Sequence, residues 1–164
     1  MAVGGTKVTV ALGGPRSVRQ VNVSALLRPT DANDAGGDTG SQNRFTALRA
    51  FDVYACNASL LNLNCTLETG FTRVYSSAHD AFPGDLPRPS APDLQLRSFH
   101  LPDTTATHLQ LRVVTNQCTG GYKFHGDQDA DPLNNSDCVS GSTADNAVRA
   151  AEFQVFSSGA LLTE

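Results

Sequence analysis

The sequence contains no tryptophan, only two lysines among its twelve cationic residues, and only three glutamates among its sixteen acidic ones. Glutamate and lysine are good helix formers, so their scarcity disfavours a helical protein. No apolar run approaches the ~20 residues that a membrane-spanning helix needs. The net charge of −4 lacks the basic excess typical of nucleic-acid-binding proteins. Composition therefore argues against a membrane span and against a nucleic-acid partner.

The residues that are plentiful favour strands, turns and loops. The chain has 164 residues, 40% of them hydrophobic, with 14 glycines and 8 prolines, which suits one domain with a core. Strands with one buried face show alternating apolar and polar residues, and this pattern recurs over residues 7–12, 18–27, 45–56, 71–75, 94–100, 107–114 and 148–156.

Breaker residues and polar stretches separate these segments. The Gly-Gly-Pro sequence at residues 13–15 is expected to end the first strand. The segment 81–92 contains four prolines and is excluded as a central strand. Long polar loops are expected at 28–44 and 116–146.

Strands at this spacing predict an all-β fold, an antiparallel β-sandwich. We expect one domain over residues 7–158. The segments 1–6 and 159–164 are expected to be linker or vector-derived ends.

The four cysteines fall into two groups, Cys56 with Cys65 and Cys118 with Cys138. Neither group has the C-x-x-C spacing of a zinc knuckle. Of the three pairings, Cys56–Cys65 and Cys118–Cys138 are favoured, because each would close a turn-rich loop between strands. The alternative is four free thiols in a cytosolic protein. Disulfides would indicate an oxidising compartment, so we expect a secreted, extracellular protein.

No combination of residues in the sequence predicts catalysis. None of the four histidines is followed by Glu-x-x-His, which excludes a two-histidine zinc site on a helix. Ser76, Ser77, His79 and Asp80 are the residue types of a hydrolase triad, but the Gly-x-Ser-x-Gly turn is missing. We assign no catalytic residue and no organic cofactor.

Carboxylates cluster in the second long loop. Asp127, Asp129 and Asp131 stand two residues apart, and Ca²⁺ takes about six to eight oxygen ligands from such loops. An EF-hand is excluded, because Pro132 replaces the required glycine and Cys138 the required glutamate. The alternative to a structural calcium site is a solvated acidic loop held by the disulfide.

Several arginines lie in or beside the strand-like segments, and they have two interpretations. Structural pairing with Asp52 or Glu152 is the first, and a site for a ligand that carries a carboxylate or sulfate is the second. The arginines concerned are Arg44, Arg49, Arg97 and Arg112.

Four stretches resemble, in order, strands of a discoidin-like, galactose-binding-type jelly roll. They are residues 7–13, 44–54, 106–113 and 148–156, and together they span most of the chain. The resemblance implies that the β-sandwich is a jelly roll.

A narrower resemblance is to accessory domains of actinobacterial secreted proteins similar to fungalysin-type zinc metalloproteases. It implies a non-catalytic domain that binds substrate for, or stabilises, a larger hydrolase. The partner would then be the remainder of that polypeptide, with a glycan or protein as substrate. The residues that carry this resemblance are 23–29, 42–49, 81–83, 87–89, 116–120 and 149–156.

The jelly-roll resemblance also implies ligands for a calcium ion. A glutamate in the closing strand of such modules often helps to hold one, which makes Glu152 a candidate. The alternative is an exposed glutamate or a partner of an arginine. Further ligands would come from the first long loop, which contains Asp31, Asp34 and Asp38.

Modules of this fold often bind glycans at the loop end by stacking a sugar on an aromatic ring. Tyr122, which lies among glycines with Phe124 and His125 nearby, is the candidate for this role. The ring of Tyr122 could equally pack onto the core. A carbohydrate-binding module is therefore the alternative function.

Overall fold

The computed structural model describes residues 3–25, 46–58, 64–82, 96–120, 147–150 and 152–157. These ranges are mostly strand, with one 3₁₀ turn (Glu68–Gly70) and one turn of helix, α1 (Gln117–Gly120). Neither is a helix long and apolar enough to cross a membrane. The expected all-β class is confirmed. The strands in the described ranges are β1 (Lys7–Ser24), β2 (Leu48–Cys56), β3 (Thr72–Ser76), β4 (Arg97–Asn116) and β5 (Glu152–Ser157).

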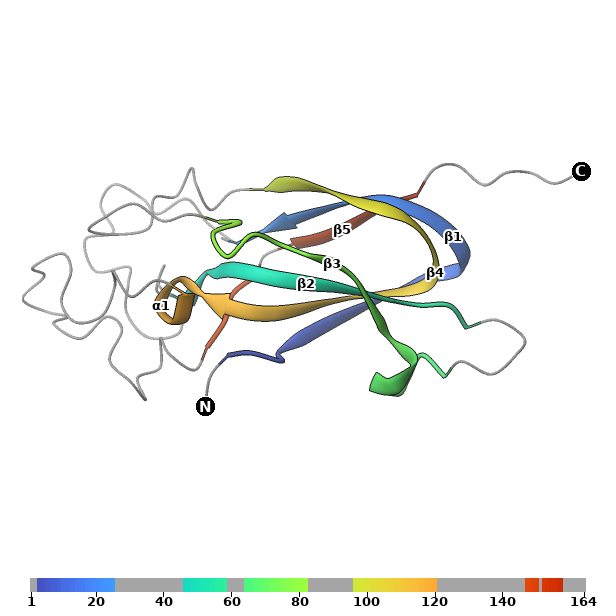
Figure 1. The fold of residues 1–164 in the computed structure, drawn as a ribbon, viewed down its shortest axis with the longest axis horizontal. Helices are drawn as coiled ribbons and strands as arrows, with labels where there is room; N and C mark the ends of the chain where they lie inside the picture. The colour runs from blue at the N-terminus through green and yellow to red at the C-terminus, as the bar shows by residue number, and fades with distance from the viewer. Residues whose placement is uncertain are drawn as a thin grey trace, which may run out of the picture.

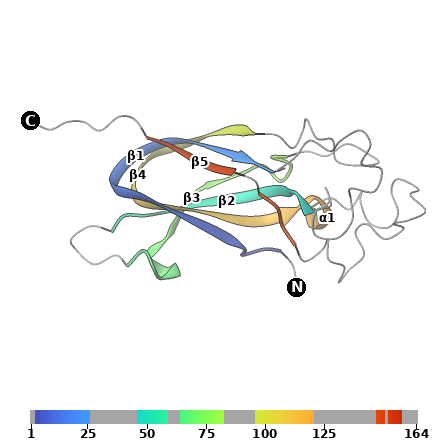
Figure 2. The same cartoon turned by 180° about the vertical axis from the view of Figure 1, so that it is seen from behind.

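The strands form one sheet, in the order β3-β2-β4-β1-β5, which folds over into two layers (Figure 1). All the pairings between these strands are antiparallel. The two long strands, β1 and β4, pair with each other and contribute to both layers. In one layer β2 pairs with β4 over His108–Asn116, and in the other β5 pairs with β1 over Val18–Ser24. The view from behind shows β5 and β2 in different layers (Figure 2). The predicted antiparallel β-sandwich is confirmed.

The bend in β1 lies at the Gly-Gly-Pro sequence. Gly13 and Gly14 have φ angles of 71° and 143°, which residues with a Cβ rarely adopt. The expectation that these residues end a strand was wrong, because the ladder with β4 resumes at Arg16. The predicted segment 107–114 and residues 97–100 of the predicted segment 94–100 likewise belong to the single strand β4. Breakers inside these long strands therefore turn the sheet without ending it.

The core lies between the layers. The predicted alternation in β2 is confirmed, since Phe51 and Val53 are fully buried. Phe51 meets Phe99 edge to face, with ring centroids 4.8 Å apart. Phe82, which follows β3 in the chain, joins the same cluster at 5.8 Å from Phe99 and is also fully buried. This aromatic cluster therefore fixes the segment after β3 to the core.

The predicted Cys56–Cys65 disulfide is confirmed. It joins the end of β2 to the turn that precedes the 3₁₀ turn. Cys118 is also disulfide-bonded. Cys138, its expected partner, lies outside the described residues.

Residues 3–6, which we expected to lie outside the domain, contact it. Val3 is buried in the core. The Gly5 N–H donates to the Val113 carbonyl at 3.0 Å, and the Val113 N–H donates to the Thr6 carbonyl at 2.8 Å. The limit of the domain near residue 158 stays a prediction.

Candidate functional site

The segment Ser77–Phe82, here called the 77–82 loop, lies at the end of the sandwich where β3 ends. Backbone and side-chain hydrogen bonds tie both of its ends to β2. The Ser77 N–H donates to the Phe51 carbonyl, and the Phe51 N–H donates to Ser77 Oγ, both at 2.9 Å. At the other end, the Phe82 N–H donates to the Arg49 carbonyl at 3.1 Å. The loop therefore has a fixed backbone although it lies at the surface.

Gln117, at the start of α1, holds the 77–82 loop in place through side-chain hydrogen bonds and is here called the clamp. Its side chain is fully buried. Its Nε2 donates to the Phe82 carbonyl at 2.6 Å and to the Leu48 carbonyl at 3.3 Å. Its Oε1 accepts a hydrogen bond from Arg49 Nη1 at 2.9 Å. One amide thus joins α1, β2 and the 77–82 loop.

Arg49 is the charged partner of this clamp. Burial lowers the pKa of the Arg49 guanidinium, and the nearby Asp80 carboxylate opposes that effect. Arg49 Nε is buried without a hydrogen-bond partner. A Cβ on Gly120 would lie 2.5 Å from Arg49 Cδ, so only glycine fits against this side chain. The position of the guanidinium is therefore closely defined.

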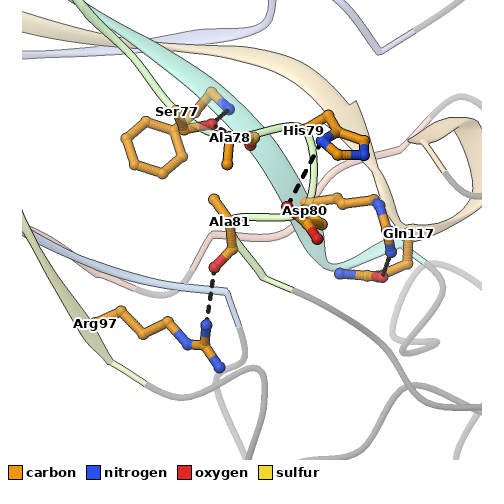
Figure 3. Close-up of polar contacts among 9 residues, drawn as sticks. Ser77, Ala78, His79, Asp80, Ala81, Arg97 and Gln117 are labelled. Atoms are coloured by element: carbon orange, nitrogen blue, oxygen red, sulfur yellow. Dashed lines mark hydrogen bonds and ion pairs between the residues drawn. The ribbon is translucent and has the colours of Figure 1, made fainter.

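The exposed part of the loop presents one donor and one acceptor side by side. His79 Nδ1 lies 3.6 Å from Asp80 Oδ1, and the two side chains are 90% and 49% exposed (Figure 3). On the other side of Ala81, Arg97 Nη1 donates to the Ala81 carbonyl at 3.1 Å, and its guanidinium lies over the Phe82 ring at 5.8 Å (Figure 3). Imidazole, carboxylate and guanidinium groups are the partners that ligand hydroxyl groups use.

Within the described residues, the structure does not assemble a hydrolase triad from Ser76, Ser77, His79 and Asp80. Ser76 Oγ donates to Asp52 at 2.6 Å, on the outer face of the sheet. Ser77 Oγ contacts the backbone of Phe51 and Ala78. His79 is close to Asp80 but bonds to neither serine in the described part of the chain.

The arginines pair differently from our expectation. Asp52 is bound by Arg73, whose Nη1 lies 3.3 Å from Oδ2, because the register of β2 and β3 sets Arg73 beside this carboxylate. Arg49 and Arg97 bind neutral amide and carbonyl oxygens. Arg112 stacks on Tyr54, with its Cζ 3.8 Å from the ring centroid. Arg44, the fourth candidate, lies outside the described residues.

Of the predicted calcium ligands, only Glu152 falls within the described residues. It is exposed at the start of β5 and accepts a hydrogen bond from Gln154 Nε2. It lines an apolar pocket of about 270 Å³ between β1 and β5, where the other charged group is Lys7. The described ranges hold no group of three residues able to bind a metal. The other candidates lie outside these ranges: Asp31, Asp34, Asp38, Asp127, Asp129 and Asp131.

The aromatic residues proposed for sugar stacking, Tyr122, Phe124 and His125, also lie outside the described residues. Sequence reasoning found only part of the site that the structure describes, namely Arg49 and Arg97 among the candidate arginines. His79 and Asp80 were considered only as triad members, and Gln117 was not singled out. A signal was present in the sequence, since a polar pair directly precedes an isolated apolar segment, residues 81–82, that can anchor a loop.

No protein-family model matches the chain, and no curated protein is similar to it. Three similar solved structures are carbohydrate-binding modules of family 32. "CBM32 of AlyQ in complex with 4,5-unsaturated mannuronic acid" is 16% identical, with a TM-score of 0.43, over 93% of this chain and 71% of that one. A Clostridium perfringens module in complex with GalNAc-β-1,3-galactose is 17% identical, with a TM-score of 0.44, over 92% and 65%.

The third, the family 32 module of Streptococcus pneumoniae EndoD, is 15% identical, with a TM-score of 0.43, over 96% of this chain and 73% of that one. None of these comparisons supports the resemblance to metalloprotease accessory domains.

Proposed function

We propose that the chain is a non-catalytic carbohydrate-binding domain that holds a sugar at the exposed side of the 77–82 loop. The single observation that carries this proposal is the pair His79 and Asp80, exposed on a loop that is anchored at both ends. An anchored loop loses little conformational entropy when it binds, which raises affinity for a small polar ligand.

The chemistry of the pair suits neighbouring sugar hydroxyl groups. A carboxylate accepts hydrogen bonds from two hydroxyls, while an imidazole N–H donates to a third oxygen. Loops at the end of a rigid scaffold are the usual position of binding residues. No nucleophile lies within hydrogen-bonding distance of His79 among the described residues, which favours binding over catalysis.

The first interpretation of the sequence, an accessory domain of a secreted metalloprotease-like hydrolase, stays an expectation. A substrate-binding domain could belong to an extracellular hydrolase of any class, so the proposed binding function does not depend on a metalloprotease. The Cys56–Cys65 disulfide supports the extracellular location, because such bonds persist in oxidising compartments.

The proposal is tested on a glycan array, followed by isothermal titration calorimetry of the oligosaccharides that bind. Removing one charged or polar contact of a binding site typically weakens affinity by about tenfold or more, which we expect for His79→Ala and Asp80→Ala. The matched control is Arg19→Ala, since Arg19 of β1 is exposed and pairs with Asp103 of β4, outside the 77–82 loop.

Two results would contradict the proposal. One is an array without any bound glycan. The other is glycan binding that survives both loop substitutions but is lost in Tyr122→Ala, which would move the site to the loop that the sequence favoured.

A further inference from the structure

Among the described residues, the site around the 77–82 loop holds one cation, Arg49, that makes no ion pair within 4 Å. Arg49 Nη1 binds a neutral amide oxygen at 2.9 Å, and its buried Nε has no partner. No carboxylate among the described residues lies within 4 Å of this guanidinium, whereas Arg19 and Arg73 do have such partners. Within the described part of the chain, the Arg49 guanidinium is therefore held in place without a carboxylate in direct contact, and Asp80 acts on it only from a greater distance.

Burial makes this imbalance costly. Desolvation lowers the pKa of Arg49, and the one opposing influence is the more distant Asp80 carboxylate. A partly buried cation that lacks an ion-pair partner is stabilised by any anion placed against it. A ligand carboxylate would bind the terminal amino groups of the planar guanidinium, because Nε is buried.

The charges around the loop favour the same kind of ligand. Arg97 lies on the other side of Ala81 and donates one N–H to that residue's carbonyl, at 3.1 Å (Figure 3). The loop and its two guanidinium groups thus carry two permanent positive charges, from Arg49 and Arg97, against one negative charge, from Asp80.

From this geometry we infer that the ligand is an acidic sugar, a uronic acid whose carboxylate pairs with Arg49 while its hydroxyls bind His79 and Asp80. This inference rests on the function proposed above and narrows it to one substrate class. Asp80 then has two opposed effects: it accepts hydrogen bonds from hydroxyl groups, and it repels the ligand carboxylate.

The test compares oligogalacturonate and oligoglucuronate with the matching neutral oligosaccharides, by isothermal titration calorimetry at low ionic strength. We expect the uronates to bind at least about tenfold more tightly, the factor that corresponds to one charge-assisted hydrogen bond. Arg49→Gln should abolish this preference, so that uronates and neutral sugars bind with equal affinity to the variant. Asp80→Asn should raise the ratio of uronate affinity to neutral-sugar affinity, because both kinds of sugar lose the same hydroxyl contacts and only the uronates lose a repulsion.

Two controls keep the result interpretable. Arg19→Gln removes a charge of the same kind from an exposed ion pair outside the loop and should leave the preference unchanged. Arg49→Lys keeps the charge but loses the planar group, so it should retain part of the preference. If Arg49→Gln does not fold, Arg49→Lys and Asp80→Asn decide, because Asp80 is about half exposed. A sulfated galactan is included, and a tighter fit to it than to any uronate overturns the assignment of a carboxylate.

Failure of this inference differs from failure of the proposed function. Equal affinity for uronates and neutral sugars, with Arg49→Gln weakening both alike, overturns the acidic ligand and leaves the sugar site in place. Binding to neither kind of oligosaccharide overturns the sugar site itself.

Discussion

Replacing Gln117 with leucine should destabilise the protein more than any other single polar substitution in the described core. Leucine keeps the approximate volume but leaves three partners of the amide without a hydrogen bond, namely the Phe82 carbonyl, the Leu48 carbonyl and Arg49 Nη1. The bond to Leu48 is long, at 3.3 Å, so it contributes least.

The magnitude follows from the environment. Gln117 is fully buried, so water cannot replace the lost bonds. A buried group left unsatisfied costs about 1–3 kcal/mol, and bonds to charged groups contribute about 1.5–3 kcal/mol, which gives about 3–5 kcal/mol in total. In a domain of this size each kcal/mol lowers Tm by about 2–4 °C, so we expect a loss of about 10 °C.

The measurement is urea unfolding followed by far-UV circular dichroism, since the chain has no tryptophan to report by fluorescence. The control is Gln154→Leu, which removes a half-buried amide from β5 and should cost less than about 1 kcal/mol. A Gln117→Leu variant within about 1 kcal/mol of the wild type would refute the idea that this amide clamps the loop. An altered m-value would instead indicate a changed unfolded state.

Three further predictions concern other parts of the molecule. Gly120→Ala should cost about 1–3 kcal/mol in thermal unfolding, because the added Cβ would lie 2.5 Å from Arg49 Cδ; an unchanged Tm would show that this side chain moves freely. Reducing the Cys56–Cys65 bridge should cost about 2–3 kcal/mol by loosening constraints on the unfolded chain, and equal stability of the Cys56→Ser/Cys65→Ser double variant would contradict this. Millimolar Ca²⁺ should raise Tm, because a ligand at 100-fold over its Kd adds about 2.7 kcal/mol to the free energy of unfolding. Glu152→Gln should reduce this rise. Identical melting curves in calcium and in EDTA would show that the acidic residues bind no calcium.

The strands of this fold can be predicted from the sequence because each strand has one buried face. The alternation of Phe51 and Val53 with Asp52 and Tyr54 predicted the inner and outer faces of β2. The alternation did not predict the burial of Asp52, which lies on the outer face and is yet only 7% exposed. Its cover comes from Arg73 and Ser76 of the neighbouring strand, and only the register of β2 and β3 brings these residues together.

The bends and the loop site could not be predicted from the sequence, because both depend on contacts between distant segments. A Gly-Gly-Pro sequence permits a turn, but whether the strand ends or continues depends on a partner strand far along the chain. Gln117 is ordinary in sequence and becomes important because three distant segments meet at its amide. Patterns within a short window report burial, whereas the clamp and the surroundings of Arg49 depend on contacts between segments.

The two strands that run through both layers have a consequence for how this chain folds. β1 pairs with β4, and more than half of the sequence separates Lys7 from its partner Arg112. During synthesis β1 must therefore wait, without its main partner, until β4 has left the ribosome. Pairing strands so far apart in the sequence requires closing a large loop, and the entropy of that closure is lost before the stabilising contacts form. Folding is therefore slow, and the strands stay unpaired and exposed for longer. Neither layer can form alone, since each contains half of the same two strands, so the domain should fold slowly, in a single cooperative step, and should be prone to aggregation until that step is complete.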